Sequence, residues 1–139
     1  AKTIAGGQSL VPMMNFRVAR PKALIDINRI KELDYIREEK DELVIGALVR
    51  ERTLEVSLLV KKKCPILADA ISYIGHLPIR TRGTIGGSLV HADPSAEIPV
   101  VICGLGGRMK VMGPSRERTL GAEEFFVTYL TSALEPGNP

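Results

Sequence analysis

Two pairs of adjacent glycines are the residues of this sequence whose type and spacing most directly suggest chemistry. The first pair occupies positions 6 and 7 and precedes Gln8; the second occupies positions 86 and 87 and precedes Ser88. Because glycine has no Cβ and tolerates positive φ, a Gly-Gly turn lets successive backbone N–H groups converge on anionic oxygens. We expect two such turns in one small domain to bind two phosphates from opposite sides.

Polar side chains surround the second pair. Thr84 and Ser88 flank it, and Asp93 and Glu97 follow four residues apart, where a helix is expected to begin. Backbone N–H groups together with hydroxyl and carboxylate side chains suit a cofactor that carries both phosphate and sugar hydroxyls. The two carboxylates are equally suited to capping the helix and compensating its dipole, so both roles stay open.

Other site classes find no support in the sequence. The first glycine pair does not match the dinucleotide pattern Gly-x-Gly-x-x-Gly, and it lacks the lysine of a P-loop. His76 and His91 are in no metal-ligand spacing and are interpreted as hydrogen-bonded loop histidines. No set of nucleophile, base and acid stands out. A bound cofactor that carries the chemistry needs none, so we predict no catalytic residue and no metal ligand in this chain.

Composition indicates one soluble globular domain. Of the 139 residues, 45% are hydrophobic and 25% charged, and the net charge of +3 is too small to indicate nucleic acid. The basic run 61–63 is interpreted as a solvated helix end. No apolar run is long enough to span a bilayer. Cys64 and Cys103 stand apart in apolar surroundings, which predicts buried, reduced thiols in a cytoplasmic protein.

The hydrophobic pattern mixes strands and helices. We expect a short strand and helix at the N-terminus, a buried strand over 23–27, and a hairpin formed by 33–38 and 43–47 around a charged turn. Thr53 is the expected N-cap of a helix, and Pro65 begins the next one, through residue 74. This order favours an α+β domain over a doubly wound parallel sheet.

The second half begins with an irregular stretch. Residues 76–94 are expected to form a long functional loop, followed by a helix over 95–104. A second hairpin is expected from 107–112 and 116–120, around a turn at 113–115. Phe125, Phe126 and Tyr129 are predicted to be a final core cluster.

The motifs also resemble those of a known family. The segment 5–10 with Pro12, then Ile45-Gly46-Ala47, then the run from Arg80 to Pro94 closely resemble the FAD-binding medium subunit of molybdenum hydroxylases. The carbon monoxide dehydrogenase type is the nearest, and it shares the flavin domain of the xanthine dehydrogenase family. This resemblance implies an α+β FAD-binding domain of the type shared by vanillyl-alcohol oxidase, carbon monoxide dehydrogenase and MurB-like flavoproteins. Such a domain has mixed sheets with antiparallel hairpins and flanking helices.

The resemblance assigns roles to individual residues. Both glycine segments hold the FAD pyrophosphate, Glu97 and Asp93 bind the sugar-like hydroxyls, and Ile74 lies near the flavin ring. The cofactor-binding residues implied in this way are Ala5, Gly6, Gly7, Gln8, Ser9, Leu10, Ile74, Thr84, Ile85, Gly86, Gly87, Ser88, Asp93 and Glu97.

The resemblance also implies an assembly. The family passes electrons from iron–sulfur clusters on a small subunit to an outside acceptor, while a large subunit carries the molybdenum–pterin centre. Residues 1–139 are expected to be a single partial FAD-binding domain, without the family's N-terminal strand–helix unit and C-terminal domain. Leu77 and Thr81 depart from the common pattern of relatives. Two alternatives stay open: a scaffold subunit that keeps the fold without tightly bound FAD, and a nucleic-acid binder.

Overall fold

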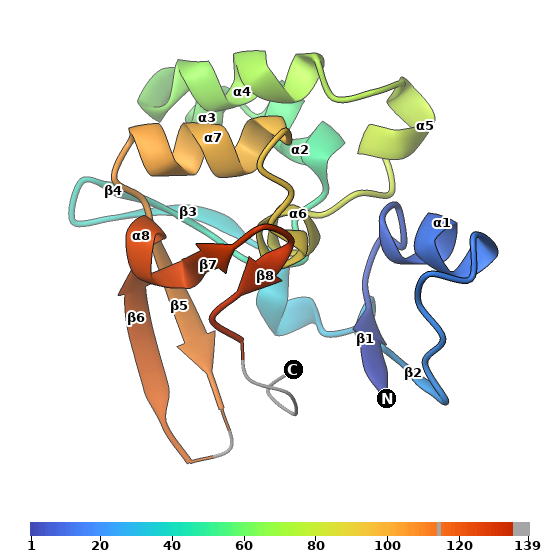
Figure 1. Ribbon diagram of the computed structural model, residues 1–139. Coiled ribbons are helices and arrows are strands. Elements are labelled where there is room, and N and C mark those ends of the chain that lie inside the picture. The colour runs from blue at the N-terminus through green and yellow to red at the C-terminus, as the bar shows by residue number, and fades with distance from the viewer. Residues whose placement is uncertain (114, 135–139) are drawn as a thin grey trace.

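The computed structural model of the protein describes residues 1–113 and 115–134. Small two-stranded sheets precede and follow a run of six consecutive helices, α2 to α7, which confirms the predicted α+β class. Figure 1 shows the N-terminal unit on one side, a layer of helices above, and the C-terminal hairpin on the opposite side. Position 114 of the predicted turn and residues 135–139 lie outside the described residues.

The N-terminal unit consists of β1 (Lys2–Ile4), α1 (Leu10–Asn15) and β2 (Leu24–Asp26), and its two strands pair in parallel. The prediction of a buried strand over 23–27 was wrong in one respect, because Leu24 and Ile25 are 44% and 53% exposed. The strand pairs only with β1 among the described residues, and all three of its residues are exposed.

The first hairpin is confirmed with shifted ends. A 3-10 helix, η1 (Lys31–Leu33), precedes β3 (Ile36–Glu39), which pairs with β4 (Glu42–Ile45) in antiparallel register. The turn contains only two residues, Lys40 and Asp41, with φ of 48° and 67°. Two successive positive φ angles match the twist that joins adjacent strands, so the hairpin closes tightly.

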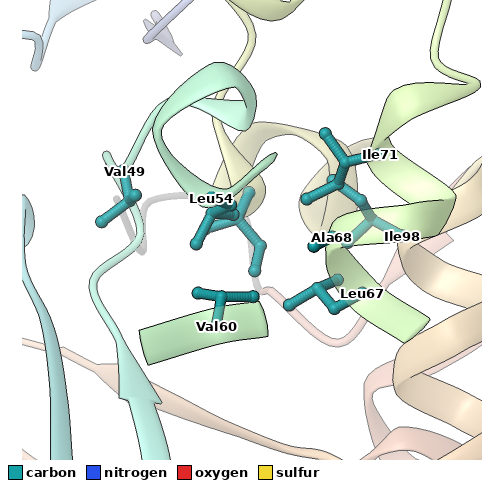
Figure 2. Packing of buried hydrophobic residues seen from close by; sticks show 8 residues of the cluster. Val49, Leu54, Val60, Leu67, Ala68, Ile71 and Ile98 are labelled. Carbon is teal, nitrogen blue, oxygen red and sulfur yellow. The ribbon is translucent and has the colours of Figure 1, made fainter. Parts of the chain in front are cut away.

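The helical layer holds the main core. It contains α2 (Glu51–Val56), α3 (Leu58–Lys63), α4 (Pro65–Ser72) and α7 (Glu97–Gly104). Thr53 is not an N-cap, because α2 already begins at residue 51; Ser57 instead caps α3 by accepting a hydrogen bond from the Val60 amide. Figure 2 shows buried side chains of these helices packed together with Val49, which precedes α2: Leu54, Val60, Leu67, Ala68, Ile71 and Ile98.

The prediction of a long loop over 76–94 was wrong. The structure has α5 (Leu77–Arg80) and α6 (Ile85–His91) there, and the second glycine pair lies in the first turn of α6 rather than in a free turn. Thr84 is the N-cap, and its Oγ1 accepts a hydrogen bond from the Gly87 amide at 3.1 Å. Two glycines and a proline lower helix propensity, which is why the sequence pattern did not indicate these helices.

The C-terminal part contains the second predicted hairpin, β5 (Arg108–Met112) with β6 (Glu117–Gly121). It is followed by α8 (Ala122–Phe125), β7 (Phe126–Thr128) and β8 (Thr131–Ser132). Phe125 is buried with Met109 in a second core cluster, and Phe126 packs against it. Tyr129 was wrongly placed in this core, since its side chain is 70% exposed.

The two cysteines differ in their surroundings. Cys64 is partly buried against the main core, whereas Cys103 is exposed on α7, so the prediction of two buried thiols was wrong for Cys103. Helix α7 packs on α4, α6 and α8, and Cys103 is on the part of its surface that these contacts leave exposed. None of the helices within 1–113 and 115–134 is long and apolar enough to cross a membrane.

Candidate functional site

The structure brings the first glycine segment against the backbone that immediately precedes the second. A Cβ added to Gly6 would lie 2.0 Å from the carbonyl oxygen of Arg82 and 3.0 Å from Cα of Gly83. Residue 6 therefore packs against the backbone that leads directly into α6. Only a glycine fits at this crossing, so the first segment and the start of α6 form the two walls of one site.

The first wall offers a row of hydrogen-bond donors. Among the described residues, no acceptor faces the five successive backbone N–H groups of 6–10; the first paired amide is that of Val11, which donates to Gly7 at 3.0 Å. All five residues are only partly exposed. Gly7 has a φ of 74°, a backbone conformation that favours glycine. Half-buried unpaired donors are costly, and consecutive ones suit a ligand with several anionic oxygens.

The backbone N–H groups of the second wall already have hydrogen-bond partners within the protein. Ile85 donates to the Val49 carbonyl at 3.1 Å, and Gly86 donates to the Ala47 carbonyl at 2.9 Å. The next two amides, at 87 and 88, bond to the Oγ1 and the carbonyl of Thr84. The amides of residues 85–88 are therefore all paired, and the predicted backbone cradle at 84–88 stays a prediction.

Two polar residues that sequence reasoning missed hold the walls together. The guanidinium of Arg50 donates to the Arg82 carbonyl and, at 2.7 Å, to Oδ1 of Asn28. Asn28 in turn donates from Nδ2 to the Ala5 carbonyl at 2.9 Å. These groups surround an open depression of about 190 Å³, lined by Ala5, Gly6, Asn28, Arg50, Thr81 and Arg82. No local signal in the sequence marked either residue, because both act through contacts with distant segments.

The other predicted residues lie around the start and end of α6. Thr84 is 2% exposed, and Ser88 is partly buried one turn later. Asp93 accepts hydrogen bonds from both the amide and the hydroxyl of Ser95, which hold the pKa of its carboxyl below the usual range. Glu97 is the first residue of α7, and Ile74 packs against the main core. Asp93 therefore closes a local turn and does not cap α7, whose N-cap is Ala96 with no side-chain hydrogen bond. The cofactor roles of these residues stay predictions.

The two histidines lie at helix ends. His76 is the exposed N-cap of α5, and His91 is the partly buried last residue of α6. Within 1–113 and 115–134, no three His, Cys, Asp or Glu side chains are grouped so that they could hold a metal ion.

A buried carboxyl lies behind the second wall. Glu51 is 6% exposed, and among the described residues its Oε2 has no hydrogen-bond partner. Its backbone N–H donates to the Gly83 carbonyl at 3.0 Å. A Cβ on Gly83 would lie 2.6 Å from Oε2, so the carboxyl lies directly against this glycine. Burial first, and then the charge of Glu97, raise the pKa of Glu51 to about 7, against a smaller lowering by Arg80.

This raised pKa predicts a pH-dependent stability. The ordinary pKa of a glutamate is 4.5, so the unfolded chain releases the proton of Glu51 before the folded chain does. The associated stability is complete below pH 4.5 and is lost as the pH rises through about 7. The wild type should lose about 2–3 kcal/mol of unfolding free energy over this pH range, and Glu51→Gln should not show that decrease. Urea unfolding at pH 5 and pH 8 measures it; an equal decrease in both proteins would contradict the assignment.

Comparison with known proteins places the chain in a family. The family model described as the FAD binding domain in molybdopterin dehydrogenase matches residues 1–138. The chain is 46% identical over 137 residues to the alpha subunit of the 6-hydroxypseudooxynicotine dehydrogenase complex of Paenarthrobacter nicotinovorans, covering 99% of this chain and 46% of the relative. The chain thus spans about half the length of the curated relatives it matches.

Solved structures agree. Carbon monoxide dehydrogenase from Hydrogenophaga pseudoflava superimposes with a TM-score of 0.93 at 43% identity, over 96% of this chain and 46% of that chain. Quinoline 2-oxidoreductase from Pseudomonas putida 86 superimposes with a TM-score of 0.95 at 36% identity, over 98% of this chain and 48% of that chain. A shared backbone together with this level of identity shows common descent. The chain therefore belongs to the family of FAD-binding domains of molybdopterin dehydrogenases.

Proposed function

We propose that this chain binds FAD as the flavoprotein part of a molybdenum hydroxylase complex and passes electrons from iron–sulfur clusters to an external acceptor. One observation carries the proposal: the row of five unpaired N–H groups over 6–10, at the crossing where Gly6 meets Arg82. A pyrophosphate supplies several anionic acceptors to consecutive amides, and nearby partial positive charge favours it. The residues present therefore fit the cofactor of the family.

In the proposed binding mode, the two walls contact different parts of FAD. Residues 5–10 hold the pyrophosphate through their amides, and Arg50 and Asn28 fix this segment in place. The segment 84–88 contributes the hydroxyls of Thr84 and Ser88, and Glu97 with Asp93 binds the sugar-like hydroxyls. Asp93 accepts from Ser95 through Oδ1, so we assign contact with the cofactor to its other oxygen. Ile74 is proposed to lie near the flavin ring.

The chemistry belongs to the cofactor. FAD, when bound, supplies a redox centre that exchanges electrons with other centres, while the protein binds and orients it. No residue of this chain needs to act as an acid, base or nucleophile for that task. The chain is thus proposed to be the electron-transfer component of an oxidoreductase rather than its substrate-selecting component.

The partners follow from the same proposal. We propose an iron–sulfur small subunit and a molybdenum–pterin large subunit, with residues 1–139 as one partial FAD-binding domain of a longer flavoprotein. The relatives are named as a complex subunit and as a medium chain, which supports a heteromeric assembly. The two cysteines are unpaired, as expected in a reducing compartment, and we propose a cytoplasmic location.

Purification of the full chain with its co-purifying subunits tests the proposal. We expect a yellow protein that releases FAD on denaturation, with molybdenum and iron in the complex. Gly7→Val should lose most of the flavin, because position 7 has a φ of 74° and its Cβ would lie 3.0 Å from the Val11 side chain. Gly104→Ala is the control, since nothing lies within 4 Å of a Cβ there.

The opposite result identifies the alternative. A colourless complex that contains the other subunits, and whose thermal transition does not move on addition of FAD, would show a scaffold without the cofactor. Flavin at one equivalent per chain would reject the scaffold.

A further inference from the structure

Glu51 is the buried ionisable group that the proposed function does not use. Its side chain is almost completely buried, and its Oε2 has no hydrogen-bond partner among the described residues. It lies against Gly83, the residue whose other side contacts the first wall through Gly6. One buried carboxyl thus lies directly behind the crossing that the cofactor is proposed to occupy.

The arginines near Glu51 form their ion pairs and hydrogen bonds with other groups. Arg80 donates to Oε2 of Glu55 at 3.0 Å and to the Ile74 carbonyl at 2.9 Å. Arg52 also pairs with Glu55, at 3.0 Å. A buried carboxylate without a partnered cation is costly, and the protonated acid avoids that cost.

Negative charges near the Glu51 carboxyl make its ionisation still less favourable. Glu97 begins α7 and raises the pKa of Glu51, and the proposed pyrophosphate would bring further negative charge to the other side of Gly83. The elements around Glu51 carry further charged side chains and one histidine. These are Arg50, the N-cap of α2, Arg52 and Glu55 of α2, Lys61, Lys62 and Lys63 of α3, Asp69 of α4, Arg80 of α5, Arg82 before α6, His91 at the end of α6, Asp93 after it, and Glu97 of α7.

We propose that Glu51 is a positioning residue of the FAD site that acts as a neutral acid. In this form it supports Gly83 and Thr84 without repelling Glu97 or the phosphates. Once ionised it places an uncompensated negative charge behind the second wall, so FAD binding and retention of the proton on Glu51 favour each other. This inference rests on the proposed function and adds a pH dependence to the same site.

The affinity of the full chain for FAD, measured against pH, tests the inference. We expect the dissociation constant of the wild type to rise about tenfold between pH 6 and pH 8.5, within the usual range of coupling between two sites. Glu51→Gln keeps the size and the neutral state of the side chain, so its affinity should match the wild type at pH 6 and stay flat above it. Glu123→Gln, at an exposed position of α8, is the matched control and should keep the wild-type slope.

The possible outcomes distinguish the role of Glu51 from FAD binding itself. A wild type that binds FAD with no slope, or the same slope in Glu51→Gln, overturns the role of Glu51 and leaves FAD binding intact. A wild type that binds no FAD at any pH overturns the proposed function and this inference with it. If Glu51→Gln does not fold, infrared spectra of the wild type decide: we expect a protonated-carboxyl band that FAD strengthens at pH 7.5, and an unchanged band contradicts the inference.

Discussion

Gly6→Ala is expected to weaken FAD binding by about 10- to 100-fold, the largest effect of a single methyl group in this chain. The added Cβ would lie 2.0 Å from the Arg82 carbonyl oxygen and 2.7 Å from its carbonyl carbon. Both atoms are backbone, so they cannot rotate away. The first wall must move off the second, and the five unpaired amides of 6–10 then lose their common direction. Equilibrium dialysis of the full chain against FAD measures the change.

Two comparisons make this result specific. Gly104→Ala adds the same methyl group where nothing lies within 4 Å, and its FAD affinity should equal that of the wild type. Thermal unfolding without FAD shows whether the variant is folded, since a folded Gly6→Ala with wild-type affinity would contradict the two-wall site. No φ strain confuses the comparison, because the strained position of this pair is Gly7.

The parts of the fold that depend on nearby residues could be predicted. The hairpin of β3 and β4 follows from its apolar alternation and a charged turn, and Pro65 begins α4 as expected for the first turn of a helix. The predicted helix after residue 95 is also present, as α7. In each case the signal lies within one element, so no knowledge of the rest of the chain is needed.

The second glycine pair shows where local reasoning fails. Helix propensity disfavours two glycines, yet α6 contains both, because the amides of Ile85 and Gly86 bond to carbonyls of Val49 and Ala47. A Cβ on Gly86 would lie 2.6 Å from the Ala47 carbonyl oxygen, so this glycine is needed for close approach rather than for a turn. The sequence pattern predicted a turn at this pair and therefore misread the physical reason for the glycine at position 86.

The connections that build the site are long-range and had no local signal. Arg50 reaches Asn28 across 22 positions and Arg82 across 32, and nothing in the sequence couples these residues. Glutamate is a residue type that is mostly exposed, so nothing in the sequence indicates that Glu51 is only 6% exposed. The errors at Cys103 and Tyr129 have the same origin, since apolar type alone does not show which face of an element is covered.

Leu54→Ala should remove about 2–5 kcal/mol of unfolding free energy, enough to unfold much of a small domain. Leu54 is 0% exposed at the centre of the main core, where α2 packs on α4, so truncation leaves a cavity among Val49, Val60 and Ile71. Leu58, on the next helix, is 83% exposed, and Leu58→Ala should change stability by less than about 0.5 kcal/mol. Urea denaturation of both variants measures the difference.

The same variant tests how far the core and the site are coupled. Leu54 lies one turn beyond Glu51, whose amide fixes the Gly83 carbonyl, so a collapse of α2 into the cavity would shift the second wall. If α2 keeps its place, folded Leu54→Ala binds FAD with wild-type affinity, and saturating FAD restores stability by mass action. We expect this second behaviour, because Glu51 is held by a backbone hydrogen bond that the truncation does not touch. Equal stability of the Leu54 and Leu58 variants would contradict the assignment of the core.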